Sequence, residues 1–282
     1  MATISENRYR IMRRTIQILL LALFIAGNVY GVKVLQGNFS SSLLLGVVPL
    51  SDPFALLQVF AAGTMVSAKA VIGGGIILLF FGVLAGRAFC AWVCPLNMVT
   101  DLADTVRERA SARGPGLQMS RNARYWVMGM SLVLSTVLGI AAFEWISPIG
   151  SLHRGIIFGM GAGWTAVAAV FLFDALVVRN GFCGHLCPLG AFYALAGRAS
   201  VVRVRHVRER CTRCMRCVEA CPEPQVLPMV GKRDGAVTSG ECTNCGRCIE
   251  VCPDQAMHFG MRTTLKEHFD TEKADQDPDK NG

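Results

Sequence analysis

Cys211-Thr-Arg-Cys-Met-Arg-Cys-Val-Glu-Ala-Cys-Pro222 is one of two stretches with the same cysteine spacing, and the other is Cys242-Thr-Asn-Cys-Gly-Arg-Cys-Ile-Glu-Val-Cys-Pro253. This spacing is typical of proteins that hold two [4Fe-4S] clusters, in which the fourth Cys of each run binds the neighbouring cluster. It therefore predicts two crossed ligand sets. The first set is Cys211, Cys214, Cys217 and Cys252, and the second set is Cys221, Cys242, Cys245 and Cys248.

Residues 199–264, which contain both runs, are predicted to form a small α+β domain with two iron-sulfur clusters. Structural zinc sites also use Cys-x2-Cys pairs, but they need only two pairs and do not account for a duplicated run of four that ends in Cys-Pro. A domain of this size has little apolar core, so we expect the clusters to supply much of its stability. Residues 265–282 are polar and are predicted to be a disordered tail.

The composition indicates that the rest of the chain lies in a membrane. Of its 282 residues, 52% are hydrophobic and only 17% are charged, a balance that a water-soluble domain rarely shows. The formal net charge is +8, but the Lys and Arg residues fall between apolar stretches and form no continuous basic face, so no nucleic-acid partner is expected. All twelve Cys residues fall in four motifs that end in Cys-Pro, which favours metal ligation over a disulfide scaffold.

Four apolar segments are predicted to span the membrane, because each is about as long as the roughly 20 residues that cross a hydrocarbon core as a helix. They are residues 15–35, 70–86, 125–143 and 156–178. Arg residues concentrate before the first segment, between the second and third, and after the fourth. The positive-inside rule therefore predicts a multi-pass membrane protein, with both termini and the cysteine runs in the cytoplasm.

Two stretches of the membrane half allow another interpretation. Arg13-Arg14 before the first segment would also suit a signal peptide, but the apolar run continues past signal-peptide length without a clear cleavage site. The external loop 38–68 is apolar, and Pro49 and Pro53 interrupt it. We expect this loop to lie on the membrane surface or to re-enter it, and not to form a fifth span.

An internal repeat divides the membrane domain, residues 1–198, into two similar helix pairs. Residues 86–96 align without gaps on residues 179–189, and each copy carries a Cys-x3-Cys-Pro motif at the cytoplasmic end of an even-numbered segment. In a helical conformation, thiols four residues apart lie on one face. The four thiols are Cys90, Cys94, Cys183 and Cys187. A third cluster or another redox-active metal is one reading of them; reduced structural thiols and a redox-active thiol pair are the others.

With these motifs in place, the chain resembles a known family. Residues 199–264 resemble bacterial two-cluster ferredoxins, and nearly the full length is similar to NapH, the ferredoxin-type quinol dehydrogenase membrane subunit of periplasmic nitrate reductase systems. The resemblance implies a quinol-oxidising subunit that passes electrons from the membrane quinol pool toward nitrate reduction. It also implies an external iron-sulfur partner subunit, periplasmic nitrate reductase and a cytoplasmic ferredoxin-type protein as partners.

Polar side chains outside the cysteine motifs are candidates for the quinol site, which needs a proton acceptor near the ring. Glu144 and His153 lie in one external loop and Asp52 in the other, although such interfacial groups also serve as anchors. Asp174 lies inside the fourth segment, where an ionisable group is functional by default or pairs with Arg87 or Arg179. Two other functions stay open: a membrane copper reductase, and a redox sensor or assembly factor.

Overall fold

The structure is a computed structural model that describes residues 7–109, 119–159, 161 and 163–262; the predicted tail, residues 265–282, lies outside the described residues. The chain divides into two compact units. We call Arg14–Leu79 with Val93–Phe192 the helical unit, and Met1–Arg13, Phe80–Trp92 and Tyr193–Gly282 the cysteine-rich unit. Each unit is described separately.

The helical unit opens with most of helix α1 (Arg8–Val29), which is followed by a small antiparallel sheet. Strands β1 (Leu35–Gly37), β2 (Ser41–Leu44) and β3 (Val48–Ser51) pair in that order, with Leu35 opposite Leu44 and Ser42 opposite Leu50. The helix therefore ends earlier than the sequence predicted, because Gly31 adopts a left-handed conformation (φ 70°). The Asn28 side chain connects the helix to the sheet. Its Nδ2 donates to the Gly37 carbonyl oxygen (2.9 Å), and its Oδ1 accepts from the Gly37 backbone N–H (3.1 Å).

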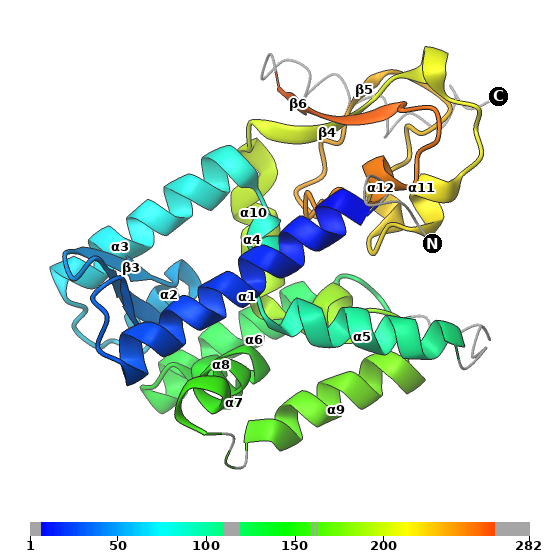
Figure 1. Ribbon diagram of the computed structural model, residues 1–282. Helices are drawn as coiled ribbons and strands as arrows, with labels where there is room; N and C mark the ends of the chain where they lie inside the picture. Colours follow the sequence, from blue (N-terminus) through cyan, green and yellow to red (C-terminus); the bar gives the residue numbers. More distant parts are fainter. Residues whose placement is uncertain (1–6, 110–118, 160, 162, 263–282) are drawn as a thin grey trace. The chain divides into compact units, whose positions relative to one another are not determined.

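Helix α2 (Pro53–Ala61) follows the sheet, so the apolar loop 38–68 folds as strands and a short helix. Pro53 occupies the first turn of α2, where a missing N–H costs nothing, and the Asp52 side chain caps it. Further along the chain lie helices α5 (Leu96–Arg109), α6 (Ala123–Leu138), α7 (Ala142–Ile146), α8 (Pro148–Phe158) and α9 (Gly163–Leu176). Helix α9 packs against both α5 and α8 (Figure 1).

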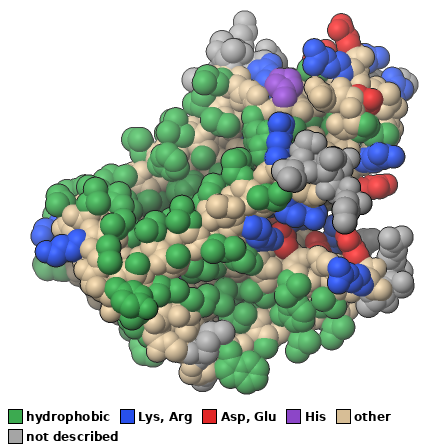
Figure 2. Space-filling view, viewed as in Figure 1, with side chains coloured by type: hydrophobic (Ala, Val, Ile, Leu, Met, Phe, Trp, Pro, Cys, Tyr) green, Lys and Arg blue, Asp and Glu red, His purple; other side chains and the backbone are tan. Residues whose placement is uncertain are grey.

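Among the residues that the structure describes, two helices are long and apolar enough to cross a membrane: Arg8–Val29, with 22 residues, and Ala68–Ala85, with 18. The second combines helix α3 (Ala68–Leu79) with a π-helical turn at Phe80–Ala85. The other two predicted segments form shorter helices, Ala123–Leu138 and Gly163–Leu176, so the count of four spans stays a prediction. Figure 2 shows hydrophobic side chains gathered on the face where α3 lies. Within α3, Ile72 and Leu79 are 59% and 65% exposed. Such a face suits contact with lipid.

The cysteine-rich unit is built on a second antiparallel sheet. Strand β4 (Val202–His206) lies between β5 (Gly235–Ala236) and β6 (Met257–Met261), with Val204 opposite Phe259. Two short helices, α11 (Arg216–Glu219) and α12 (Arg247–Glu250), contact each other, and each carries the third Cys of its run. The core joins apolar side chains of the sheet, such as Val204 and Met257, to buried cysteines. The C-terminal part thus has the ferredoxin-like α+β architecture that the sequence predicted.

Candidate iron-sulfur site

The loop of the second cysteine run surrounds a cavity with thiols. Cys242, Cys245 and Cys248 line this cavity together with Cys221 from the first run. The remaining walls are Val204, Glu223, Val226, Leu227, Thr243 and Gly246. Four thiols around one largely apolar cavity are the donor set that a [4Fe-4S] cluster requires. These four residues, which are the second predicted ligand set, therefore fit that group.

Both cysteine loops have the same unusual backbone. In the first run Arg213 and Met215 are left-handed, each with φ 58°, and in the second run Asn244 and Gly246 are left-handed, with φ 48° and 77°. Alternating right- and left-handed residues turn successive backbone N–H groups toward one concave side, which favours an anionic group such as a thiolate-ligated cluster. The Arg213 amide, for example, donates to the Cys211 sulfur at 3.4 Å.

Burial and mutual repulsion disfavour free thiolates in the second set. Loss of water raises the pKa of Cys221 well above its usual range, and the neighbouring charges of Cys245 and Cys242 raise it further. Burial also raises the pKa of Cys242 to about 11, although the nearby Arg203 and Arg87 oppose the shift. Thiolate ligands at these positions need a compensating positive charge, which bound iron would provide.

The first set is more open to solvent. Cys214 is exposed, Cys211 and Cys252 are partly buried, and Cys217 is buried. Burial raises the pKa of Cys217, and the thiols that raise it further are Cys252 and then Cys211. Cys252 therefore lies with the first run, as Cys221 lies with the second. Within the described residues no three His, Cys, Asp or Glu side chains are close enough to hold a single metal ion; in a cubane each thiol binds a different iron.

Buried polar contacts surround the second loop. Arg87 donates to Glu223 at 2.8 Å, and both side chains are nearly inaccessible. The Asn244 side-chain amide donates to the backbone carbonyl oxygens of Ala85 (2.9 Å) and Val202 (3.0 Å). The Trp92 indole N–H donates to the backbone carbonyl oxygen of Asn244 (3.0 Å). Sequence reasoning did not identify Asn244 or Glu223. The sequence did contain a signal for Asn244: an Asn between two ligand cysteines suits a left-handed backbone position, which Asn adopts more readily than most residues.

Neither Cys-x3-Cys-Pro pair lies within one helix. Helix α4 (Ala88–Trp92) contains Cys90 and ends before Cys94, and the π-helical turn Phe182–Leu186 contains Cys183 and ends before Cys187. The shared helical face expected for each pair is therefore wrong. A residue before Pro is driven toward an extended conformation, so each second Cys falls in the break before the next helix. Convergence of the four thiols stays a prediction.

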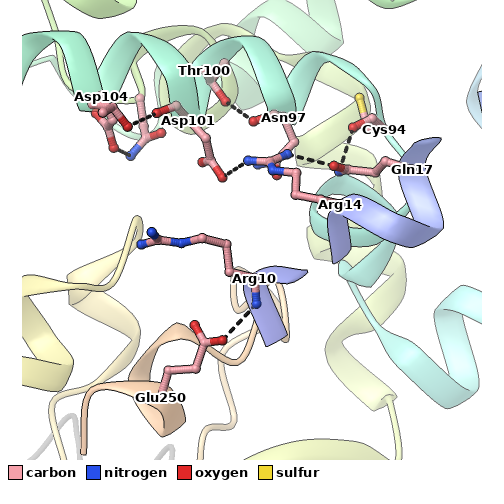
Figure 3. A network of polar contacts seen from close by, with 11 residues as sticks. Arg10, Arg14, Gln17, Cys94, Asn97, Thr100, Asp101, Asp104 and Glu250 are labelled. Carbon is pink, nitrogen blue, oxygen red and sulfur yellow. Dashed lines mark hydrogen bonds and ion pairs between the residues drawn. The ribbon is translucent and has the colours of Figure 1, made fainter. Parts of the chain in front are cut away.

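The second Cys of each Cys-x3-Cys-Pro pair accepts a hydrogen bond. The Cys187 sulfur accepts the Gly190 amide at 3.4 Å, at the beginning of α10 (Pro188–Ala196). In the other motif, the Gln17 side chain of α1 donates to the Cys94 carbonyl oxygen at 3.1 Å (Figure 3). Arg14 donates to Gln17 at 2.7 Å and pairs with Asp101 of α5. Helix α1 thereby holds the turn that contains Cys94.

Three of the candidate proton-accepting residues lie near the small sheet of the helical unit. Glu144 accepts a hydrogen bond from the Ser40 hydroxyl at 2.7 Å. Loss of water raises the pKa of Asp52 to about 7, and the charge of Glu144 adds to the shift. The ring of His153 is buried against Phe24 and Phe39, with centroids at 4.6 and 4.2 Å.

His153 has an unusual environment for an imidazole. Its side chain is 1% exposed, and neither ring nitrogen has a hydrogen-bond partner among the described residues. Burial and, to a smaller extent, the charge of Arg154 together lower the pKa of His153 to about 4, so the ring is neutral near pH 7. A buried polar group without a partner is costly, which makes it a candidate to bind a ligand.

Asp174 has a structural contact. Its carboxylate accepts the Phe182 amide at 2.9 Å and so holds the start of the π-helical turn that contains Cys183. Arg179, one of its predicted partners, pairs instead with Asp104 (3.4 Å), and Arg87 pairs with Glu223. The predicted pairing of Asp174 with either Arg is not found in the described part of the chain.

Comparison with known proteins gives matches over both halves. A family model described as a 4Fe-4S binding domain matches residues 68–112 and 156–208, which include the two Cys-x3-Cys-Pro motifs. A model described as a 4Fe-4S dicluster domain matches residues 203–253, which include both four-Cys runs. No solved structure matches the chain at a significant level.

Several curated proteins resemble the chain over most of its length. It is 46% identical over 241 residues to the methylamine utilization ferredoxin-type protein MauN of Methylorubrum extorquens, covering 84% of each chain. It is 42% identical over 231 residues to the ferredoxin-type protein NapH of Haemophilus influenzae, covering 81% of this chain and 80% of that protein. It is 41% identical over 223 residues to NapH of Escherichia coli, covering 79% and 77%.

Proposed function

The chain belongs to the family of ferredoxin-type proteins that includes NapH and MauN, and from that premise we propose that it oxidises membrane quinol and relays the electrons through two [4Fe-4S] clusters. An electron-transfer role follows from the family and its 4Fe-4S domains. The observation that carries the proposal is the grouping of thiols from both cysteine runs around one cavity. Clusters bound there would supply one-electron carriers.

Quinol oxidation releases two electrons and two protons, so the protein must accept protons where quinol binds. We assign this role to the group of Asp52, Glu144 and His153. Near pH 7 the neutral His153 ring has one nitrogen that can accept a hydrogen bond from a quinol hydroxyl. Asp52, whose pKa is raised to about 7, can take up a proton in the same pH range. The Phe24 and Phe39 rings beside His153 offer an apolar wall for a quinol ring.

The four thiols of the Cys-x3-Cys-Pro pairs form the third part of the proposal. Cys90, Cys94, Cys183 and Cys187 would hold a further iron-sulfur cluster that takes part in the electron relay. The match of a 4Fe-4S binding model to both motif regions supports this assignment. Iron analysis tests it: Cys90→Ser or Cys187→Ser should remove about four iron atoms and leave the other cluster signals intact. An unchanged iron content in both variants would leave these thiols as structural or thiol-redox groups.

For topology, we propose an inner-membrane protein with four spans and cytoplasmic termini. The Arg distribution supports this orientation, and two helices already have the length and apolarity to span. A reporter that is active only in the cytoplasm should work when fused after Met261 and fail when inserted near Ser151. The opposite result would place the cysteine runs outside the cytoplasm.

The deciding experiment measures quinol-dependent reduction of the clusters. The protein is purified anaerobically into lipid vesicles, duroquinol is added, and cluster reduction is followed by electron paramagnetic resonance. We expect reduction by duroquinol in the wild type, and a rate about 100-fold lower in Glu144→Gln and His153→Phe, with unchanged spectra after dithionite. Zinc in place of iron, or reduction by dithionite alone in the wild type, would contradict the proposal. Added Cu(II) tests the copper-reductase alternative.

The destination of the electrons has two candidates. The NapH relatives support delivery through an external iron-sulfur subunit to periplasmic nitrate reductase. The 46% identity to a protein named for methylamine utilization favours a second candidate, a relay that serves methylamine oxidation. Deletion of the gene should impair growth that depends on one of these substrates and not on the other.

A further inference from the structure

The two cysteine runs differ in exposure. From Arg208 to Arg216 every residue is exposed except Cys211, which is partly buried. Cys214, at the centre of this stretch, is an exposed thiol. In the second run, by contrast, Cys242, Cys245 and Cys248 are all buried. A cluster held by the first set would therefore lie close to the protein surface, where a second protein can exchange electrons with it.

The exposed stretch is strongly basic. Between residues 208 and 216 it carries four Arg residues and a single acidic residue, Glu209. The basic side chains are Arg208, Arg210, Arg213 and Arg216, and none of them makes a hydrogen bond or ion pair with another described residue. Met215, which is 44% exposed, adds an apolar contact among them. Arg combined with an exposed apolar side chain is a frequent composition at protein interfaces.

Two acidic side chains near the exposed stretch, Asp234 and Asp254, accept hydrogen bonds from it. Asp234 accepts the Arg208 backbone amide at 2.7 Å, and Asp254 accepts the Thr212 hydroxyl at 2.6 Å. These carboxylates stabilise the backbone of the stretch and leave its guanidinium groups available. Within residues 7–109, 119–159 and 163–262, these carboxylates do not neutralise the exposed guanidinium groups.

A groove opens beside the crossed ligand of the first set. It has a volume of about 730 Å³, and Cys252, Arg210, Arg8 and Tyr9 are among its lining residues. A partner protein can therefore reach the first thiol set at two places: at the exposed Cys214, and at Cys252 through the groove. Arg210 contributes to both the exposed stretch and the groove.

We propose that residues 208–216 and this groove form the docking surface for an acidic one-electron carrier protein, which exchanges electrons at the first thiol set. One electron leaves that site and reduces the carrier's cofactor by one electron, with no covalent bond and no proton transfer. A protein suits this surface better than anionic lipid, because the Arg residues flank an exposed ligand thiol in the sequence and a lipid headgroup accepts no electron. This inference rests on the proposed electron relay and names its partner class on the ferredoxin-like side.

The test measures binding of the iron-loaded protein, in lipid nanodiscs, to an acidic flavodoxin and to a basic cytochrome c at about 20 and about 200 mM salt. We expect flavodoxin to bind more tightly, and its affinity to fall at the higher salt. The double variant Arg208→Glu with Arg210→Glu, which leaves the cysteine loop unchanged, should lower the flavodoxin affinity at least about tenfold. Arg216→Gln should weaken binding, whereas Arg247→Gln, at the same position of the second run, should not.

Control measurements separate the outcomes. Iron content and quinol-dependent cluster reduction should be unchanged in the docking variants, whereas failure of the relay itself would appear in the wild type. Equal flavodoxin affinity in the wild type and the double variant would overturn the inference. Loss of binding to phosphatidylserine vesicles in that variant, with flavodoxin binding retained, would assign the surface to lipid. Flavodoxin binding that appears only after deletion of residues 263–282 would assign it to the chain's own acidic tail.

Discussion

The two cysteine runs share their spacing and their backbone conformation, yet one is exposed and the other is covered. Position for position, Arg213 and Met215 of the first run correspond to Asn244 and Gly246 of the second. Asn244 is held by the carbonyl groups of Ala85 and Val202, whereas Arg213 is exposed to solvent. The comparison teaches that local spacing determines the shape of a cluster-binding loop, and that residues far along the chain determine its solvent exposure.

The largest expected effect separates the ligand sets. Cys245→Ser and Cys214→Ser should each remove about four of about eight iron atoms from the ferredoxin-like part. Cys245 is buried, so its loss should also lower the melting temperature more than the loss of exposed Cys214. Iron and sulfide assays, resonance spectra and thermal unfolding measure both effects.

The crossed ligands sharpen this prediction. Cys221→Ser lies in the first run but should reproduce the spectrum of Cys245→Ser, because Cys221 lines the same cavity. A spectrum that matched Cys214→Ser would show that each run binds its own cluster.

The next effect concerns the ion pair beside the second loop. Arg87→Met removes the charged group of a buried ion pair with Glu223, which should cost about 3–5 kcal/mol of unfolding free energy. The reduction potential of the second site should also fall, since a positive charge near Cys242 has been removed. Denaturant unfolding and a redox titration test the two parts. Adding Glu223→Leu should recover stability and much of the potential, because the Glu223 carboxylate lines the same cavity and its negative charge acts on Cys221. No recovery of the potential in the double variant would argue against the electrostatic effect.

A smaller effect tests the packing of Tyr9 against the second cysteine loop. A Cβ atom at Gly246 would lie 2.7 Å from the Tyr9 ring, so Gly246→Ala should destabilise by up to about 3 kcal/mol. Met215→Ala, at the equivalent left-handed position, should change stability by less than about 0.5 kcal/mol. Thermal unfolding of the iron-loaded variants measures both. Tyr9→Ala should relieve most of the Gly246→Ala effect; no relief would mean that backbone strain, and not the ring, is the cause.

The smallest effect compares Asn244 and Arg213, the first left-handed residue of each cysteine loop. Asn244→Ala removes two buried side-chain hydrogen bonds and should cost about 1–2 kcal/mol. Arg213→Ala should have almost no effect on unfolding, because the Arg213 side chain is exposed. Equal destabilisation by the two substitutions, measured by denaturant unfolding, would remove the distinction between the loops.

Local sequence patterns were sufficient for several features. The cysteine spacing predicted the ferredoxin-like part, since a short loop with fixed ligand offsets has few ways to surround a cluster. The assignment of each Cys to a cluster stays a prediction. Long apolar runs predicted the helices Arg8–Val29 and Ala68–Ala85, because a spanning helix needs only length and apolarity. These properties depend on residues that are close together in the chain.

Other features depended on contacts between distant residues. Pro95 and Pro188 end the helices before Cys94 and Cys187, but the contact of Gln17 with the Cys94 carbonyl needed the fold. The sequence placed His153 in an external loop, and only the structure revealed its burial against Phe24 and Phe39. Cysteine spacing determines the two loops of the ferredoxin-like part, but the tertiary structure decides that the second is covered and the first is open. The physical reason is that burial depends on which distant side chains pack against a loop, and no local pattern encodes that.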